Sequence, residues 1–182
     1  IPPHRGELMY PIPGHLAFAA SSARFFKVSI PVAVIASFVP DVIDKGLNDL
    51  LQITPYGRYF MHSIPSVVVC SVLVGWLWGK ESGWGWFAGH ATHLAGDLGS
   101  FLPLWMPFVQ YDWPPDKNIT LYAITNPFRH LFSPEMLSEL MMGIWTLALF
   151  RFARNADRFS RVQQLICYTG IWAYGLLRVW LG

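Results

Sequence analysis

Two ionisable side chains lie at helical spacing inside an apolar stretch of the sequence. His93 and Asp97 are four residues apart within Gly89–Asp97, and His90 lies one turn before His93. Residues at this spacing share one face of a helix. Ionisable groups in an apolar, membrane-embedded helix are costly and normally face a cavity or one another. The spacing therefore predicts that His93 and Asp97 belong to a functional site.

Three other segments carry side chains of the same chemical kind. Two carboxylates follow Pro40 at the end of an apolar run, and one histidine lies at the start of each of two other apolar runs. With the segment above they give four His and three Asp without Cys, a nitrogen and oxygen set that suits Zn, Mn or Fe better than a thiolate site. We predict a divalent metal site, with Zn as the first choice and Mn or Fe as alternatives. The predicted ligands are His15, Asp41, Asp44, His62, His93 and Asp97.

Each of these residues also has a purely structural explanation. His15 and His62 could cap helix starts. Asp41 could be a turn residue, and Asp44 could pair with the lysine that follows it. His90 could hydrogen-bond a neighbouring helix, so we rank it below the six predicted ligands. Taken together, these explanations must account for many polar groups from separate segments on one side of the protein, and we therefore favour the metal site.

The elements that must position these residues are short apolar helices. Hydrophobic residues make up 53% of the 182 residues, the mean hydropathy is +0.36, and charged residues make up 13%, where soluble domains carry about 25%. Strand-like alternation is nearly absent. We predict an all-α, polytopic transmembrane helix bundle of five to six short membrane-embedded helices, forming a single membrane domain over residues 1–182.

The predicted segments follow from the apolar runs and the Pro-rich stretches. Residues 1–13 form an extended N-terminal arm, 14–107 the motif-bearing helices, 108–135 an external loop and 136–182 two C-terminal spans. Within 14–107 we expect helices at 14–26, 29–39, 62–79 and 84–98, a polar loop at 41–61, and an apolar continuation at 101–108. The first two helices are shorter than the ~20 residues of a full span, and a tilted or re-entrant hairpin would accommodate them.

Loop charges predict the orientation. Four arginines between the two C-terminal spans place that linker in the cytoplasm by the positive-inside rule. Counting back through the spans places the predicted ligands toward the outer side of the membrane. The four arginines are Arg151, Arg154, Arg158 and Arg161.

The order of these motifs resembles that of a known family. Gly14–His15 is followed by Pro40–Lys45, then by Gly57–Ser63 and by Gly89–Asp97. This series resembles the YdjM family of inner-membrane, metal-dependent hydrolases. The resemblance implies a multi-pass protein of the prokaryotic plasma (inner) membrane with hydrolase activity. It maps the polar site onto the same six residues, with Arg58 nearby.

The sequence departs from the pattern of this family at two positions. Many members read Pro-Asp-x-Asp-His, whereas here the second Asp comes one residue later, as Asp44, and Lys45 follows it. Many also have His-Arg before the His-Ser pair, whereas Gly57 stands here in place of that His. These departures predict that one ligand or proton-transfer group of the family is missing from this chain.

A metal in this site would support hydrolysis. A bound divalent ion makes hydroxide available near neutral pH and polarises a phosphoryl or carbonyl oxygen. We expect Asp44 to act as general base and Arg58 to neutralise a substrate phosphate. A site near the outer leaflet favours an ester or phosphoester of a lipid or a lipid-linked compound.

Two other functions are compatible with the sequence. The chain could be a non-catalytic accessory subunit of a larger membrane complex, with the N-terminal arm and the 108–135 loop as contacts to a membrane protein partner. It could also be a transporter with the His and Asp residues as an ion relay, although no inverted repeat is visible. The formal charge of +2 is too small to indicate a nucleic-acid partner.

Overall fold

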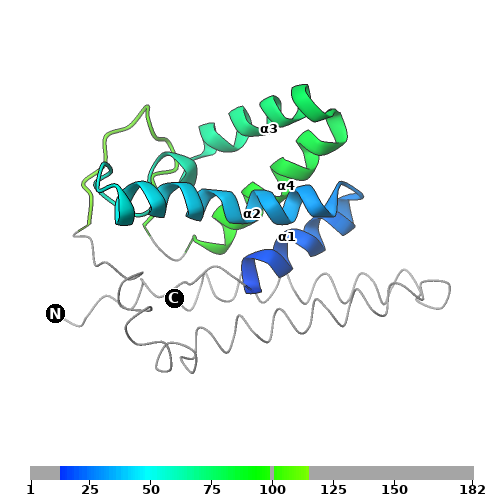
Figure 1. Ribbon diagram of the computed structural model, residues 1–182, viewed down its shortest axis with the longest axis horizontal. Coiled ribbons are helices and arrows are strands. Elements are labelled where there is room, and N and C mark those ends of the chain that lie inside the picture. The colour runs from blue at the N-terminus through cyan, green and yellow to red at the C-terminus, as the bar shows by residue number, and fades with distance from the viewer. Residues whose placement is uncertain (1–12, 99–100, 115–182) are drawn as a thin grey trace.

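This computed structural model describes residues 13–98 and 101–114, which contain four α-helices and two short helical turns (Figure 1). No strand occurs in these residues, which confirms the predicted all-α class for this part of the chain. The α-helices are α1 (Pro13–Phe26), α2 (Ile30–Lys45), α3 (Ile64–Trp78) and α4 (Lys80–Gly96), and the turns are the π-helical η1 (Gly46–Leu50) and the 3-10 turn η2 (Phe60–His62).

The helix α2 is longer than the sequence predicts. It begins after Ser29 and has a proline in its first turn, where the missing amide hydrogen costs nothing. We expected it to stop at Pro40, but it runs through Pro40 to Lys45. The proline removes one helical hydrogen bond, and its burial in the bundle holds the helix together at that point. The predicted loop therefore begins too early, since the chain is helical from Asp41 to Leu50, and Asp41 and Asp44 lie one turn apart on the last turns of α2.

A sharp reversal joins α3 to α4. Ser63 caps the start of α3 and accepts a hydrogen bond from the amide of Ser66. Gly79 adopts φ +90°, a conformation that side chains other than glycine rarely take, and α4 begins directly after it at Lys80. The predicted start of this helix at Trp84 was therefore too late.

Small residues let the helices approach α4 closely. A Cβ on Gly83 would lie 2.8 Å from the Cα of Gly75 in α3. A Cβ on Gly89 would collide with the backbone carbonyl of Ala33 in α2. Because α4 packs against α1, α2 and α3, it is the central helix of the described bundle.

The predicted apolar continuation over residues 101–108 is not helical. Residues 101–114 form turns and irregular chain, and prolines at 103 and 107 remove two of the amide hydrogens that a helix would need. This segment docks on the bundle through the carbonyl of Leu104, which accepts a hydrogen bond from the amide of Ile64 at the start of α3.

Within the described residues, none of the helices combines the length and the hydropathy expected of a membrane span. The predicted N-terminal arm, most of the 108–135 loop, the two C-terminal spans and their arginine linker lie outside these residues.

The turns that connect the helices and the predicted site lie at opposite ends of the bundle. The α1–α2 turn at residues 27–29 and the α3–α4 turn at Gly79 lie at one end of the bundle (Figure 1). The C-terminal ends of α2 and α4 and the turn η2 lie toward the other end. Five of the six predicted ligands therefore lie on these three elements or directly after α4, and His15 lies near the start of α1.

Candidate metal centre

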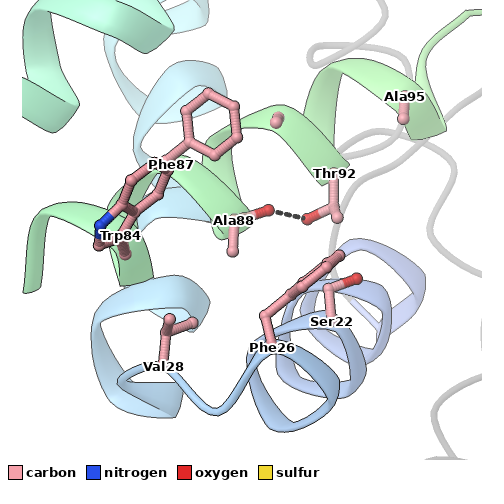
Figure 2. Close-up of a pocket in the computed structure, with 9 residues that line it drawn as sticks. Ser22, Phe26, Val28, Trp84, Phe87, Ala88, Thr92 and Ala95 are labelled. Carbon is pink, nitrogen blue, oxygen red and sulfur yellow. Dashed lines mark hydrogen bonds between the residues drawn. The ribbon is translucent and has the colours of Figure 1, made fainter. Parts of the chain in front are cut away.

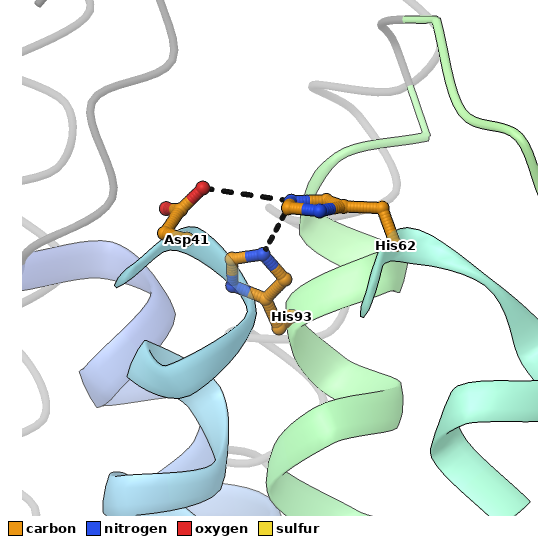
Figure 3. A group of neighbouring side chains, drawn as sticks. All are labelled: Asp41, His62 and His93. Carbon is orange, nitrogen blue, oxygen red and sulfur yellow. Dashed lines mark hydrogen bonds and ion pairs between the residues drawn. The ribbon is translucent and has the colours of Figure 1, made fainter. Parts of the chain in front are cut away.

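The core of the site is a group of three buried side chains from α2, η2 and α4. The Nε2 atoms of His62 and His93 lie 3.1 Å apart, and Nε2 of His62 lies 3.5 Å from Oδ1 of Asp41 (Figure 3). Each residue offers a ligand atom within 4.8 Å of the others, and all three are buried. These three residues could hold a metal ion.

The spacing of these atoms fits one shared ion. Zn binds His and Asp at ~2.0–2.2 Å with tetrahedral geometry, so two of its ligand atoms lie about 3.4 Å apart. Without an ion, at most one of the two facing imidazole nitrogens can donate a proton to the other. A cation between them would engage both lone pairs.

Asp97 and His15 extend the group on its α1 side. Oδ2 of Asp97 lies 3.5 Å from Nε2 of His62 and 3.7 Å from Nε2 of His93. Nε2 of His15 lies 3.6 Å from Oδ1 of Asp97, and the His15 ring packs on the His93 ring with centroids 4.4 Å apart. Nε2 of His15 and Nδ1 of His93 are buried without a hydrogen-bond partner in the described structure. Such orphaned nitrogens need an explanation, and a bound ion would provide one for His15.

Asp44 contacts His62 from the opposite side of the ring. Its Oδ2 lies 2.7 Å from Nδ1 of His62, whose Nε2 faces the other ligand atoms. The same carboxylate accepts hydrogen bonds from the amides of Tyr59, Met61 and His62. This arrangement fixes the tautomer and the orientation of the ring, as carboxylates commonly do behind metal-binding histidines. The structure thus places Asp44 behind His62, with both of its oxygens engaged.

Arg58 holds the Asp97 carboxylate from the loop before η2. Nε of Arg58 lies 3.1 Å from Oδ2 of Asp97, and the second nitrogen, Nη2, lies 3.5 Å from Oδ1. Burial by itself would lower the pKa of Arg58, but the charge of Asp97 raises it above its ordinary value. The guanidinium therefore stays charged, and two of its five N–H donors are already directed at Asp97.

The site carries an excess of negative charge. Three buried carboxylates, on Asp41, Asp44 and Asp97, face two cationic side chains, Arg58 and Lys45. Burial disfavours a charged His62, but its hydrogen bonds to Asp41 and Asp44 raise the pKa of this histidine above the usual value. The surroundings of His62 therefore attract positive charge, which favours a cation at its Nε2.

Lys45 contacts the Asp41 carboxylate. Its Nζ lies 2.8 Å from Oδ1 of Asp41, one helical turn earlier. The i, i+4 spacing could have indicated this contact from the sequence. A Cβ on Gly57 would lie 3.7 Å from Cγ of Lys45. The two departures from the family pattern are thus neighbours in the structure.

His90 has an environment distinct from that of the metal-type cluster, the buried group formed by His15, Asp41, Asp44, His62, His93 and Asp97. Its Nε2 lies 2.8 Å from the carbonyl of Met61, and its Nδ1 accepts a hydrogen bond from the Trp86 indole at 3.3 Å. An indole only donates, so His90 is neutral here and donates through Nε2. It ties α4 to the η2 turn that carries His62. The spacing of Trp86 and His90, one turn apart on α4, was a signal that the sequence analysis missed.

The structure brings together side chains that lie far apart in the sequence. All six predicted ligands lie in one buried group, with Arg58 at its edge and Asp44 behind His62. The alternative that His62 caps a helix is wrong, because Ser63 caps α3. The residues in the group are His15, Asp41, Asp44, His62, His93 and Asp97.

Comparison with known proteins gives a single kind of match. The family model described as YdjM inner membrane protein matches residues 12–180. No curated protein matches the chain. No solved structure matches it either.

Proposed function

The chain belongs to the family of YdjM inner membrane proteins, and on this premise we propose that it is a multi-pass, metal-dependent hydrolase of the prokaryotic plasma membrane. The proposal rests above all on one observation. Two buried imidazole nitrogens face each other at 3.1 Å beside a buried carboxylate, in a group with more negative than positive charge. A divalent cation is the simplest partner for such a group.

We assign the ligand roles from the distances. Nε2 of His62, Nε2 of His93 and the Asp41 carboxylate form the first set of ligands. Asp97 lies next to the two histidines and is the fourth candidate. His15, whose buried Nε2 makes no hydrogen bond in the described structure, completes the nitrogen and oxygen set. We expect Zn first, with Mn or Fe as alternatives.

When bound, such an ion lowers the pKa of a coordinated water toward ~7 and polarises a phosphoryl or carbonyl oxygen. The side chains of this protein supply the remaining functions. Asp44 holds the His62 ring in place through Nδ1. Arg58 neutralises Asp97 and has further N–H donors for an anionic substrate. The general-base role that the sequence suggests for Asp44 requires it to exchange one of its present hydrogen bonds.

The surface of α3 supports a membrane location. Val69, Val72 and Trp76 on this helix are 55%, 65% and 80% exposed. Large exposed apolar surfaces of this kind contact lipid or another protein. We therefore propose that α3 contacts the bilayer. We also propose that the substrate is an ester or phosphoester, and that the molecule that carries it is a lipid. The same surface would serve an accessory subunit of a membrane complex, which is the alternative function.

Metal analysis separates the two functions. The full-length chain would be purified in mild detergent without added metal and analysed by elemental mass spectrometry. We expect stoichiometric Zn, Mn or Fe, and we expect hydrolysis of a chromogenic phosphodiester or ester that a chelator abolishes and the metal restores. A preparation without metal that co-purifies with a membrane protein would favour the accessory subunit and reject the hydrolase.

A further inference from the structure

A cavity lies between α1 and α4, on a different face of α4 from the metal-type cluster. It has a volume of about 650 Å³. Its walls are almost entirely apolar, and Figure 2 shows the rings of Trp84 and Phe87 at one end and small side chains along α4. Cavities of ~300–1,000 Å³ are typical of ligand sites. The apolar lining includes Phe26, Val28, Trp84, Phe87, Ala91 and Ala95.

Two hydroxyl groups line this cavity, and they differ in their hydrogen bonds. The Thr92 hydroxyl donates to the carbonyls of Ala88 and Gly89 within its own helix (Figure 2). The Ser22 hydroxyl is fully buried and has no hydrogen-bond partner in the described residues. A buried hydroxyl without a partner is costly. The cavity therefore contains an apolar wall and one unused donor, Ser22.

The cavity leads from the turn end of the bundle toward the metal-type cluster. Ser22 and His15 are seven residues apart on α1, which is about 10 Å along the helix, and they share a face. On α4 the lining runs from Trp84 to Ala95, which reaches the level of His93 and Asp97 along the helix axis but on another face of the helix. The route from the cavity to the cluster therefore runs along α1, from Ser22 toward His15.

We infer that this cavity holds one acyl chain of an ester-linked membrane phospholipid, whose head group lies at the metal-type cluster. The inference deepens the proposed function and rests on it. The apolar chain matches the lining between Ala91 and Trp84. The ester carbonyl accepts the unused hydrogen of Ser22, and the phosphodiester extends along α1 toward His15 and Arg58. The bilayer around a membrane protein consists of such lipids, so no soluble carrier is needed to deliver the ligand.

Photo-crosslinking tests the inference. The full-length protein would be reconstituted in phosphatidylcholine vesicles containing phosphatidylglycerol with a diazirine on one acyl chain. After irradiation, mass spectrometry would map the labelled residues, and the metal content would be measured on the same samples. We expect labels on the cavity residues of α1 and α4, in addition to labels on the exposed face of α3.

Three variants make the test specific. Ala91→Trp fills the cavity, and we expect loss of its labels, whereas Val72→Trp adds the same bulk on the exposed face of α3 and should leave them. Ser22→Ala removes one unpaired hydroxyl without straining the fold, and the labelling should fall about fivefold, as for one hydrogen bond. All three variants should keep the metal content of the wild type.

The possible outcomes separate the two proposals. Labels confined to α3 in the wild type would overturn the inference, whether the cavity is empty or filled by another segment of this chain. Unchanged cavity labels in Ala91→Trp would overturn it as well. Cavity labels in a protein without metal would support the lipid site and reject the hydrolase.

Discussion

The side chains of His62 and His93 meet through their Nε2 atoms at 3.1 Å, although the residues are 31 positions apart in the sequence. His62 ends the short turn η2, and His93 lies near the end of α4. The opposite nitrogen of His62 is held by Asp44. The two Nε2 atoms are therefore presented to the same point, where one cation could contact both.

Replacement of His93 by Ala should remove the metal. This change deletes one of the three ligand atoms that lie closest together and removes one of the two imidazole nitrogens that face each other. We expect elemental analysis of the purified variant to fall from stoichiometric metal to background. His90→Gln is the matched control, since His90 contacts Met61 and Trp86, and it should keep its metal. Equal metal in the two variants would contradict the assignment.

Replacement of Asp44 by Asn should weaken metal binding without abolishing it. The amide cannot accept from Nδ1 of His62 and from three backbone amides as the carboxylate does. Loss of such an orienting carboxylate typically lowers metal affinity about 10–100-fold. A competition titration with a chelating dye measures the change. If Asp44→Asn abolished binding as completely as His93→Ala, Asp44 would be a direct ligand.

The sequence predicts the α4 half of the site well. The spacing of His93 and Asp97 depends only on helix geometry, and both side chains lie in the site as their shared face requires. The α2 half was less predictable, because a proline normally ends a helix and Pro40 does not. The contact of Asp44 with His62 depends on how the loop before η2 folds back on α2, and no local pattern encodes that. The same holds for the ion pair of Arg58 with Asp97, which joins residues 39 positions apart.

Replacement of Arg58 by Met should destabilise the protein. Arg58 and Asp97 are both buried, and removal of one partner leaves a buried charge that costs about 3–5 kcal/mol. Denaturant unfolding in the presence of a chelator would measure the free energy of unfolding of the metal-free protein. The second change Asp97→Asn should restore part of the loss in the double variant.

Lys80→Met is the control for Arg58→Met. It removes a cation at an exposed position at the start of α4, and we expect a change within about 0.5 kcal/mol. Equal losses for Arg58→Met and Lys80→Met would show that the Arg58–Asp97 pair contributes nothing special.

Replacement of Lys45 by Met should tighten metal binding. The lysine ammonium lies 2.8 Å from the Asp41 oxygen that faces His62, so it competes with a metal ion for this ligand and repels the ion. Lys45 is 27% exposed, and we therefore expect a modest gain of about fivefold in affinity, which corresponds to ~1 kcal/mol. The same dye titration applies, with Lys45→Arg as a variant that keeps the charge. A weaker affinity for Lys45→Met would show that the lysine supports the site.

Metal affinity should fall as the pH falls. An imidazole must lose its proton to bind a metal, so affinity is full above the pKa of His62 and decreases by about tenfold per pH unit below it for each proton displaced. Because the pKa of His62 is raised by Asp41 and Asp44 after the opposing effect of burial, the decrease should begin above the ~6.5 of an ordinary histidine. Dye titrations across the pH range would locate it. Asp44→Asn removes one of the two hydrogen bonds that raise this pKa, so the decrease should begin at lower pH in that variant. If the metal affinity of the wild-type protein did not change with pH, His62 would be excluded as a ligand.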